Sequence, residues 1–209
     1  MTILESSASI NKREQIIDVA TMFFWGKGYN GTSMRNIASE VGMMQAGLYY
    51  YFSSKEEILY EVLDKGINDL LRDGEPIYKL DLPPMEKCRL MVYTHAYKTL
   101  ISSQGQLTDT LRIFTRESQN LNPEHRVKYV EKRDRYEGFL RDIIKECVEQ
   151  GVFVRVDYKL TTFAIFGMCN WLMNWYRGDG ELSSEYLANY WAYLVCDVFL
   201  AKFRPTESQ

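Results

Sequence analysis

Apolar residues recur three to four positions apart along almost the whole chain, which is the spacing of helices that bury one face. The first such stretch, residues 13–29, gathers on one side Ile16, Ile17, Ala20, Phe23 and Phe24. The same period predicts two short helices around a turn at Gly42 within residues 32–52, and further helices at residues 56–71, 85–102, 107–118, 123–150, 158–176 and 183–203. Runs with the two-residue period of a strand are too short to suggest a sheet. The chain is therefore predicted to be all-α.

Residues that end helices separate these stretches. The segment from Asp73 to Pro84 contains Gly74 and Pro76 and is expected to break the long helix that starts at Glu56. Residues 152–156, Val-Phe-Val-Arg-Val, form the one strand-like run. An isolated strand would have no partner, so we expect an extended connector there.

Residues 32–52 have the pattern of a helix-turn-helix. The hydroxyls of Thr32 and Ser33 can cap the first helix, and Gly42 supplies the positive φ that reverses the chain. Leu48 returns the apolar face in the second helix. The N-terminal end of that helix, the part of a recognition helix that meets base edges, consists of Gln45, Ala46 and Gly47. The pattern indicates a protein that binds double-stranded DNA.

With its flanks, residues 13–63, this motif resembles the N-terminal DNA-binding domain of TetR/AcrR-type transcriptional regulators. The residues that carry the resemblance are Gly28-Tyr29, Thr32, Ile37-Ala38, Gly42, Leu48 to Phe52 and Lys55-Glu56. The resemblance implies a TetR-like fold with a three-helix DNA-binding domain over residues 1–54. It also implies a larger helical domain over residues 55–209 that binds an effector and forms a homodimer.

The resemblance implies roles for individual positions. Gln45 and Ala46 would read bases, and Arg35 would reach a base or a phosphate. The other expected DNA-binding residues are Thr32, Ser33, Gly47, Tyr49, Tyr50, Tyr51 and Lys55. These residue types suit the roles, since Gln pairs with adenine and Arg with guanine, whereas hydroxyls and Lys hold phosphates.

Two residues depart from the family pattern. Met44 stands where the family often has a capping Ser, and Gly47 stands where it often has a phosphate-binding Thr. Gly47 either permits close approach to DNA or loosens the helix by about 1 kcal/mol, and both interpretations stay open. Tyr49 and Phe52 share a helical face with Leu48 and are expected to lie partly in the core, which makes Tyr50 and Tyr51 the stronger candidates for contact with DNA.

Composition limits the class of protein. The chain has 209 residues and 46% hydrophobic content, enough for a substantial core, and its net charge of −3 neither supports nor excludes sequence-specific DNA binding. Four widely spaced cysteines without a C-x-x-C pair suggest reduced, mostly buried thiols of a cytoplasmic protein. No apolar run approaches the length of a membrane span.

The sequence contains no recognisable cluster of metal-binding or catalytic residues. His95 and His125 are the only histidines and lack partners at ligand spacing, so we expect no metal. Neither a nucleophile with a base nor a phosphate-binding loop is recognisable, so we expect no cofactor and no enzymatic activity.

The last two predicted helices are apolar and aromatic on more than one face, which suits a two-fold interface between helix pairs. In TetR-like regulators these helices form the dimer. A dimer would place two recognition helices about 34 Å apart and predicts a palindromic operator.

Residues 166–183 resemble a narrower branch of the family, regulators of lipid and sterol catabolism that respond to acyl-CoA thioesters. A small hydrophobic or amphipathic effector needs an apolar cavity with a few polar groups. The expected effector-binding residues are Tyr93, His95, Tyr97, Arg112, Phe114, Arg116, Phe139, Asn170, Trp171 and Trp175. Arg112 or Arg116 would meet an anionic group.

Three alternatives stay open at this point. A regulator of multidrug efflux would line its pocket with the same aromatic residues and bind aromatic or cationic compounds. A dimer that has lost its effector would bind the operator without response. Trp171 and Trp175 suit a core or an interface as well as a ligand pocket, and His95 suits a hydrogen-bonded interior position.

Overall fold

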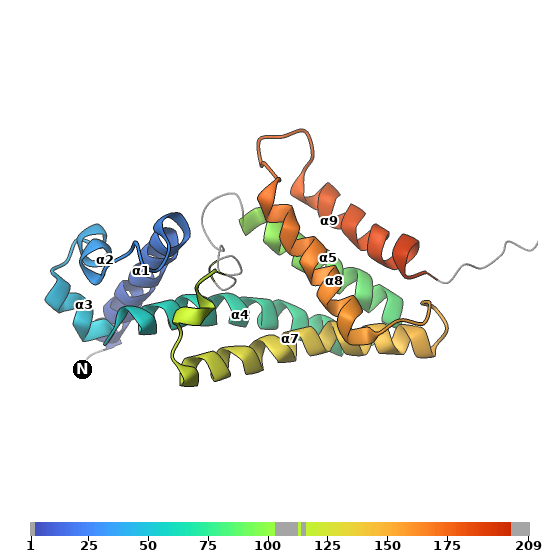
Figure 1. Ribbon diagram of the computed structural model, residues 1–209, viewed down its shortest axis with the longest axis horizontal. Coiled ribbons are helices and arrows are strands. Elements are labelled where there is room, and N and C mark those ends of the chain that lie inside the picture. Colours follow the sequence, from blue (N-terminus) through green and yellow to red (C-terminus); the bar gives the residue numbers. More distant parts are fainter. Residues whose placement is uncertain (1–2, 103–112, 114–115, 202–209) are drawn as a thin grey trace, which may run out of the picture. The chain divides into compact units, whose positions relative to one another are not determined.

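The computed structural model of the chain describes residues 3–102, 113 and 116–201, and every regular element in them is helical (Figure 1). In chain order the α-helices are α1 (Ile3–Lys27), α2 (Met34–Glu40), α3 (Gln45–Tyr51), α4 (Lys55–Lys79), α5 (Pro84–Ser102), α7 (Pro123–Glu149), α8 (Tyr158–Trp171) and α9 (Ser184–Tyr193). Short 3-10 turns occupy Ser118–Asn120 and Leu172–Asn174, and a π-helical turn occupies Leu194–Phe199. The all-α prediction is confirmed.

The chain forms two compact units. The first combines residues 1–68 with 107–131, and the second combines 69–106 with 132–209. Helices α4 and α7 each begin in the first unit and end in the second. The helix predicted at 107–118 lies largely outside the described residues.

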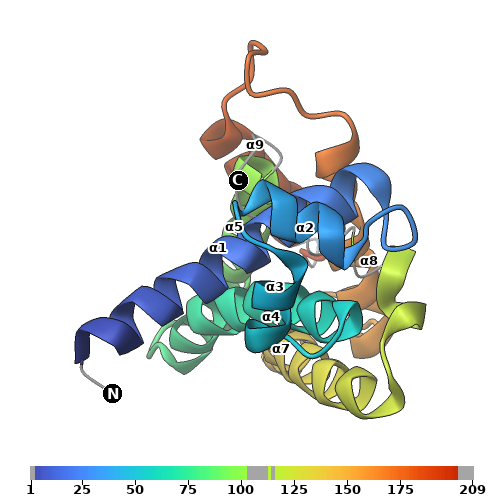
Figure 2. The same ribbon diagram turned by 90° about the vertical axis from the view of Figure 1, so that its left-hand side faces the viewer.

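The core of the first unit joins α1 to the helix-turn-helix, and Figure 2 shows α2 and α3 facing the viewer. Ile16, Ile37 and Leu48, one from each of the three helices, are fully buried. Ser33 caps α2, because its Oγ accepts the amide of Asn36 at 3.1 Å while its own amide donates to the Asn36 side chain. Gly42 has φ +72°, as the turn requires.

Helix α4 continues past the expected break at Asp73 and ends only at Lys79. Next to Pro76, Glu75 pairs with Lys79 at 2.8 Å and with Arg135 on α7 at 2.9 Å. Gly74 is needed for packing rather than for turning, because a Cβ there would lie 2.8 Å from Cε2 of Tyr136. Tertiary contacts therefore override the local signal for a break.

Helix α1 also begins earlier than expected, at residue 3 rather than 13. Residues 3–12 contain neither glycine nor proline, so nothing in them stops a helix from extending toward the N-terminus.

In the second unit, α8, α9 and the π-helical turn pack on α5 (Figure 1). The four cysteines are buried, as predicted. The strand-like run is an extended connector as expected, but it does have a partner: Phe153 forms an isolated antiparallel bridge with Ala201, and the amide of Val154 donates to the carbonyl of Leu200 at 2.9 Å. Within the described part of the chain, no helix has the length and apolar character to cross a membrane.

Two glycine substitutions separate packing from helix propensity. We expect Gly74→Ala to lower the free energy of unfolding by about 1–3 kcal/mol, because the added methyl group overlaps the ring of Tyr136. Gly47→Ala should instead raise it by up to about 1 kcal/mol, since a Cβ there meets only Met43 at 3.9 Å. Urea unfolding measures both. A stabilising Gly74→Ala would contradict the packing role of Gly74.

Candidate nucleic-acid interface and effector site

Two buried side chains orient α3. Leu48 is 0% exposed and Phe52, directly after the helix, is 1% exposed. Tyr50 between them is 76% exposed and Tyr49 is 50% exposed. Phe52 thus lies in the core as expected, while Tyr49 keeps half of its surface free. Gln45 and Ala46 at the N-terminal end of α3 are also exposed.

The neighbouring predicted residues divide into exposed and buried groups. Ser33 and Arg35 are exposed at the start of α2, and Tyr51 is half-buried with its ring edge-on to Tyr50 at 5.1 Å. Thr32 is only 2% exposed. Its Oγ1 donates to the carbonyl of Gly28 at 2.8 Å, so its hydroxyl serves the loop between α1 and α2.

Lys55 is engaged inside the first unit. Its Nζ donates to the carbonyl oxygens of Tyr29 and Thr32, both at 2.7 Å, and lies 4.0 Å from the centre of the Tyr29 ring. Burial lowers the pKa of Lys55, and the negative charge of Glu117 opposes that shift. An ammonium group has three N–H donors, so one remains for another acceptor.

The two departures from the family pattern have visible consequences. Met44 occupies the N-cap of α3 and offers no side-chain hydrogen bond. Gly47 is half-buried, and a Cβ there would make an ordinary van der Waals contact with Cε of Met43 at 3.9 Å. The amide of Gly47 donates to the carbonyl of Met44 at 2.9 Å, so the first turn of α3 is closed by its own backbone and lacks a side-chain cap.

In the second unit, a chain of three polar side chains connects three helices, and two of them, His95 and Tyr136, are buried. Nδ1 of His95 on α5 lies 3.0 Å from the hydroxyl of Tyr136 on α7, and Nε2 lies 2.9 Å from Oδ1 of Asn170 on α8. Because Oδ1 can only accept, Nε2 carries the proton and the tyrosine donates to Nδ1. Burial lowers the pKa of His95 to about 4, although the bond to Asn170 opposes this, and burial raises the pKa of Tyr136. The imidazole is neutral at pH 7.

Aromatic rings surround this polar chain. Phe166 lies 4.5 Å from His95 and 5.4 Å from Tyr136, measured between ring centres. Phe139, one turn after Tyr136, is buried and stacks on Tyr78 at 5.0 Å. Sequence reasoning named His95, Asn170 and Phe139 but missed Tyr136. Its spacing from Phe139 on the same face of α7 was the available signal.

The remaining predicted effector residues are dispersed. Tyr93 and Tyr97 are half-buried and stack at 5.7 Å on α5. Trp171 is 65% exposed, and Trp175 is exposed and lies 6.1 Å from Trp191. Arg116 is exposed in the first unit, whereas Arg112 and Phe114 lie outside the described residues. Of the predicted effector residues that the structure describes, only His95 and Asn170 are joined by a direct hydrogen bond.

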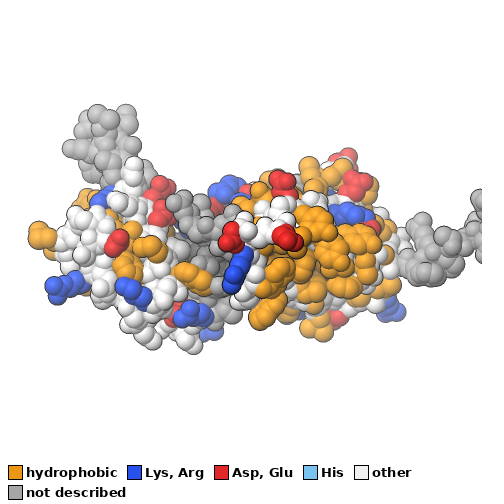
Figure 3. Space-filling model, turned by 90° about the horizontal axis from the view of Figure 1, so that it is seen from above, with side chains coloured by type: hydrophobic (Ala, Val, Ile, Leu, Met, Phe, Trp, Pro, Cys, Tyr) orange, Lys and Arg blue, Asp and Glu red, His pale blue; other side chains and the backbone are white. Residues whose placement is uncertain are grey.

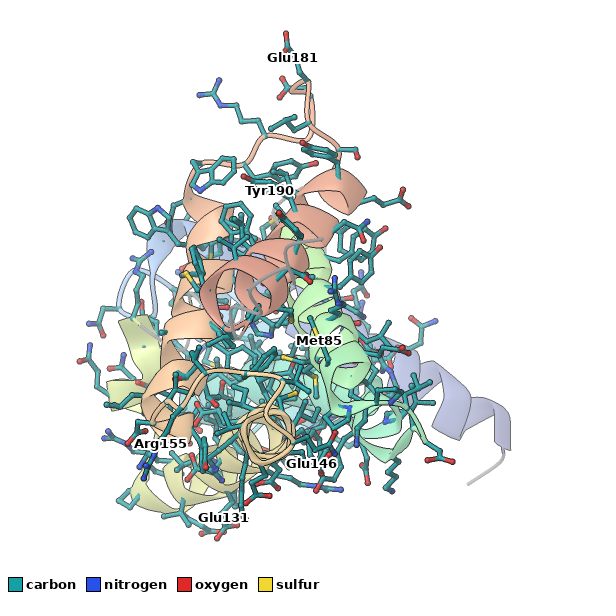
Figure 4. All side chains as sticks on the ribbon, turned by 90° about the vertical axis from the view of Figure 1, so that its right-hand side faces the viewer. Met85, Glu131, Glu146, Arg155, Glu181 and Tyr190 are labelled. Atoms are coloured by element: carbon teal, nitrogen blue, oxygen red, sulfur yellow. The ribbon has the colours of Figure 1, made fainter. Side chains whose placement is uncertain are left out.

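Helices α8 and α9 each expose an apolar stripe. On α8 the exposed residues at helical spacing are Leu160, Phe163, Ala164, Gly167 and Trp171. On α9 they include Tyr186, Tyr190 and Tyr193, and Figure 4 shows Tyr190 below the loop that carries Glu181. A groove of about 430 Å³ runs between α8 and the π-helical turn. Figure 3 shows the broad hydrophobic surface that results on the second unit. Surfaces of this kind mark interfaces.

A helix-turn-helix with an exposed recognition helix, followed by a helical unit with an apolar face, defines the class of helix-turn-helix regulatory proteins. Residues 16–62 match the family model described as bacterial regulatory proteins, tetR family. Residues 81–199 match the model described as tetracyclin repressor-like, C-terminal domain. The chain belongs to the TetR family of transcriptional regulators.

Similar proteins extend over nearly the whole chain. The HTH-type transcriptional repressor KstR2 of Mycobacterium tuberculosis (strain ATCC 25618 / H37Rv) is 23% identical over 188 residues, 88% of this chain and 91% of KstR2. The TetR family regulator PfmR from Thermus thermophilus is 34% identical with a TM-score of 0.72, over 87% of this chain and 96% of PfmR. AibR, crystallised with isovaleryl coenzyme A and operator DNA, is 25% identical with a TM-score of 0.79, over 88% of this chain and 98% of AibR.

The buried His95 makes stability depend on pH. Its pKa is about 4 in the folded protein and about 6.5 when unfolded, so the unfolded chain binds the extra proton between these values. Stability is therefore present above pH 6.5 and is lost as the pH falls toward 4, by about 2 kcal/mol at pH 5. We expect His95→Gln to flatten the pH dependence of the urea midpoint between pH 6.5 and 5. An unchanged slope in the variant would rule out His95 as its source.

Proposed function

We propose that the chain is a homodimeric transcriptional repressor that binds a palindromic operator and is released by a small amphipathic effector. The observation that carries the proposal is the orientation of α3, in which Leu48 and Phe52 are buried while Gln45, Ala46 and Tyr50 are exposed. A surface of this composition supplies an adenine-reading amide and hydroxyls for phosphates. Residues 1–54 would act as the DNA-binding domain and residues 55–209 as the effector-binding and dimerisation domain.

We assign the DNA contacts to groups that can reach a duplex. Gln45 and Ala46 would contact bases, with Arg35 at a base or a phosphate. Backbone contacts would come from Ser33, Gly47, Tyr49, Tyr50, Tyr51 and the remaining N–H of Lys55. Thr32 would contribute by holding the loop before α2, because its hydroxyl already donates to Gly28.

The second copy of the chain would cover the stripes on α8 and α9. Leu160, Phe163 and Trp171 lie at helical spacing and are exposed, and so are Tyr186 and Tyr190. Two such helices from each protomer suit a four-helix bundle. A two-fold axis through that bundle would relate two recognition helices, about 34 Å apart, to the two halves of the operator.

The effector site would include the polar chain of His95, Tyr136 and Asn170. A few convergent polar groups within an apolar, aromatic interior are the usual composition of a site for a small amphipathic molecule. AibR was crystallised with isovaleryl coenzyme A and operator DNA, which supports an acyl-CoA thioester as the class of effector. A preference of about 3 kcal/mol for the conformation that does not bind DNA would lower operator affinity more than a hundredfold.

Gln45→Ala tests the base-reading assignment. We expect the variant to fold normally and to lose about 1–3 kcal/mol of discrimination between the operator and random DNA, because an adenine contact is removed. Fluorescence anisotropy of labelled DNA from upstream of its own gene, at fixed salt with and without isovaleryl coenzyme A, measures it. Retained discrimination would contradict the role of Gln45, and a wild-type protein without any preference would overturn the repressor proposal.

Phe163→Glu tests the dimer interface. A carboxylate buried without a partner costs several kcal/mol, so the dissociation constant of the dimer should rise about a hundredfold. Val127→Glu on α7 is the control, because Val127 is also an exposed apolar residue but lies outside the two stripes. Analytical ultracentrifugation over a dilution series separates the two variants. Equal behaviour of both would place the interface elsewhere.

A further inference from the structure

The first turn of α4 is held from two sides by consecutive residues. Lys55 contacts the loop between α1 and α2, and Glu56 contacts the turn that precedes α7. Neighbouring residues of a helix point about 100° apart, so the two side chains bond to different partners. All of these residues belong to the first compact unit.

Both carboxylate oxygens of Glu56 are engaged by residues at the start of α7. Its carboxylate accepts the backbone amide of Asn122 at 2.9 Å, the side-chain amide of Asn122 at 3.0 Å, and lies 3.0 Å from Nδ1 of His125. The His125 ring stacks face to face on Tyr60 at 4.0 Å with an interplanar angle of 9°. Both side chains are mostly buried, with 18% of Glu56 and 19% of His125 exposed. Hydrogen bonds to a charged acceptor in such surroundings are stronger than those at an open surface.

Asn122 connects this cluster to α7. Its Oδ1 accepts the amide of His125 at 2.8 Å, so Asn122 caps the helix that starts at Pro123. Its N–H groups donate to Glu56 at the same time. The first turn of α4 and the first turn of α7 are therefore both hydrogen-bonded to Asn122. A shift of either turn would disturb the other through this residue.

On the other side, Lys55 fixes the loop that starts α2. The carbonyl groups that it binds belong to Tyr29 and Thr32, and Thr32 directly precedes the N-cap Ser33. The buried carboxylate of Glu117 lies against the same loop, with Oε1 only 3.1 Å from the position of a Cβ on Gly28. The segment before α7 thus contacts the start of α4 at Glu56 and the loop between α1 and α2 at Gly28.

We propose that Glu56 is a positioning residue that transmits the position of the turn before α7, through Lys55 and the loop of residues 28–33, to the start of α2 and so to the recognition helix. This role rests on the proposed function, since it names the junction through which the rest of the chain acts on operator binding. Glu56 itself would contact no DNA. Its effect would be on the specific complex, in which α2 and α3 must fit the groove.

Glu56→Gln and Glu57→Gln form a matched pair. Each variant removes one negative charge from the first turn of α4. The Glu57 carboxylate, however, accepts hydrogen bonds from a local partner, the backbone amide and the Oγ of Ser53, both at 2.7 Å. Hydrogen–deuterium exchange of the full-length protein needs neither DNA nor effector. We expect Glu56→Gln to raise exchange at least tenfold at the amides of Thr32, Asn36 and Ile37. Glu57→Gln should leave these three amides unchanged.

Asn122→Ser is the control for a general loss of stability as the cause of faster exchange. Serine retains a capping oxygen for α7 but lacks the side-chain N–H that reaches Glu56. It should raise exchange at the same three amides. A change confined to residues 53–60 and 118–126 in Glu56→Gln would overturn the proposal.

Operator affinity gives an independent readout. Glu56→Gln should lower the ratio of specific to non-specific DNA affinity about tenfold relative to Glu57→Gln. Because both variants lose the same charge, a difference between them reports the position of α2 and α3 and not the change in net charge. An equal ratio in the two variants would overturn the positioning role. If the wild-type chain preferred no operator while the exchange effect occurred, the junction would stand and the proposed repressor function would fail.

Discussion

The burial of Leu48 and Phe52 is the constraint on which the DNA-binding surface depends. A helix of seven residues is too short to be stable alone, so contacts with α1 and α2 must hold it. Each fully buried side chain of this size contributes about 1.5–3 kcal/mol relative to an exposed one. With these two residues fixed four positions apart, the rotation of α3 is fixed as well, and Tyr49 and Tyr50 can only face outward.

The spacing of apolar residues and the positions of the glycines predicted most of the fold. The period located the helices and the buried Ile16, Ile37 and Leu48, and positive φ at Gly42 followed from the turn. The extension of α4 through Gly74 and Pro76 was not predictable, because it depends on Arg135 and Tyr136 from a distant part of the sequence. Local propensity describes a residue's preference, and long-range packing decides whether the preference is obeyed.

The candidate sites were harder to predict than the fold, since side-chain direction is settled by partners. A threonine hydroxyl next to a helix start can cap it or bond backward, and Thr32 takes the second choice at Gly28 while Ser33 takes the first. The polar chain around His95 joins residues 41 and 75 positions away, so no spacing rule connects them. Sequence could nominate His95 and Asn170, but only the packing of α5, α7 and α8 reveals Tyr136 as the third member.

The helical phase of α4 within the second unit restricts how this chain can change length. Inserting one residue into a helix advances everything after it by about 1.5 Å and turns it by about 100°. An insertion within α4 between Leu71 and Gly74, both in the second unit, would therefore rotate Gly74 relative to the buried Leu71, away from Tyr136, and misalign Glu75, which pairs with Arg135. Length variation among relatives should accordingly be confined to connections such as residues 176–183, where a change alters no helical phase.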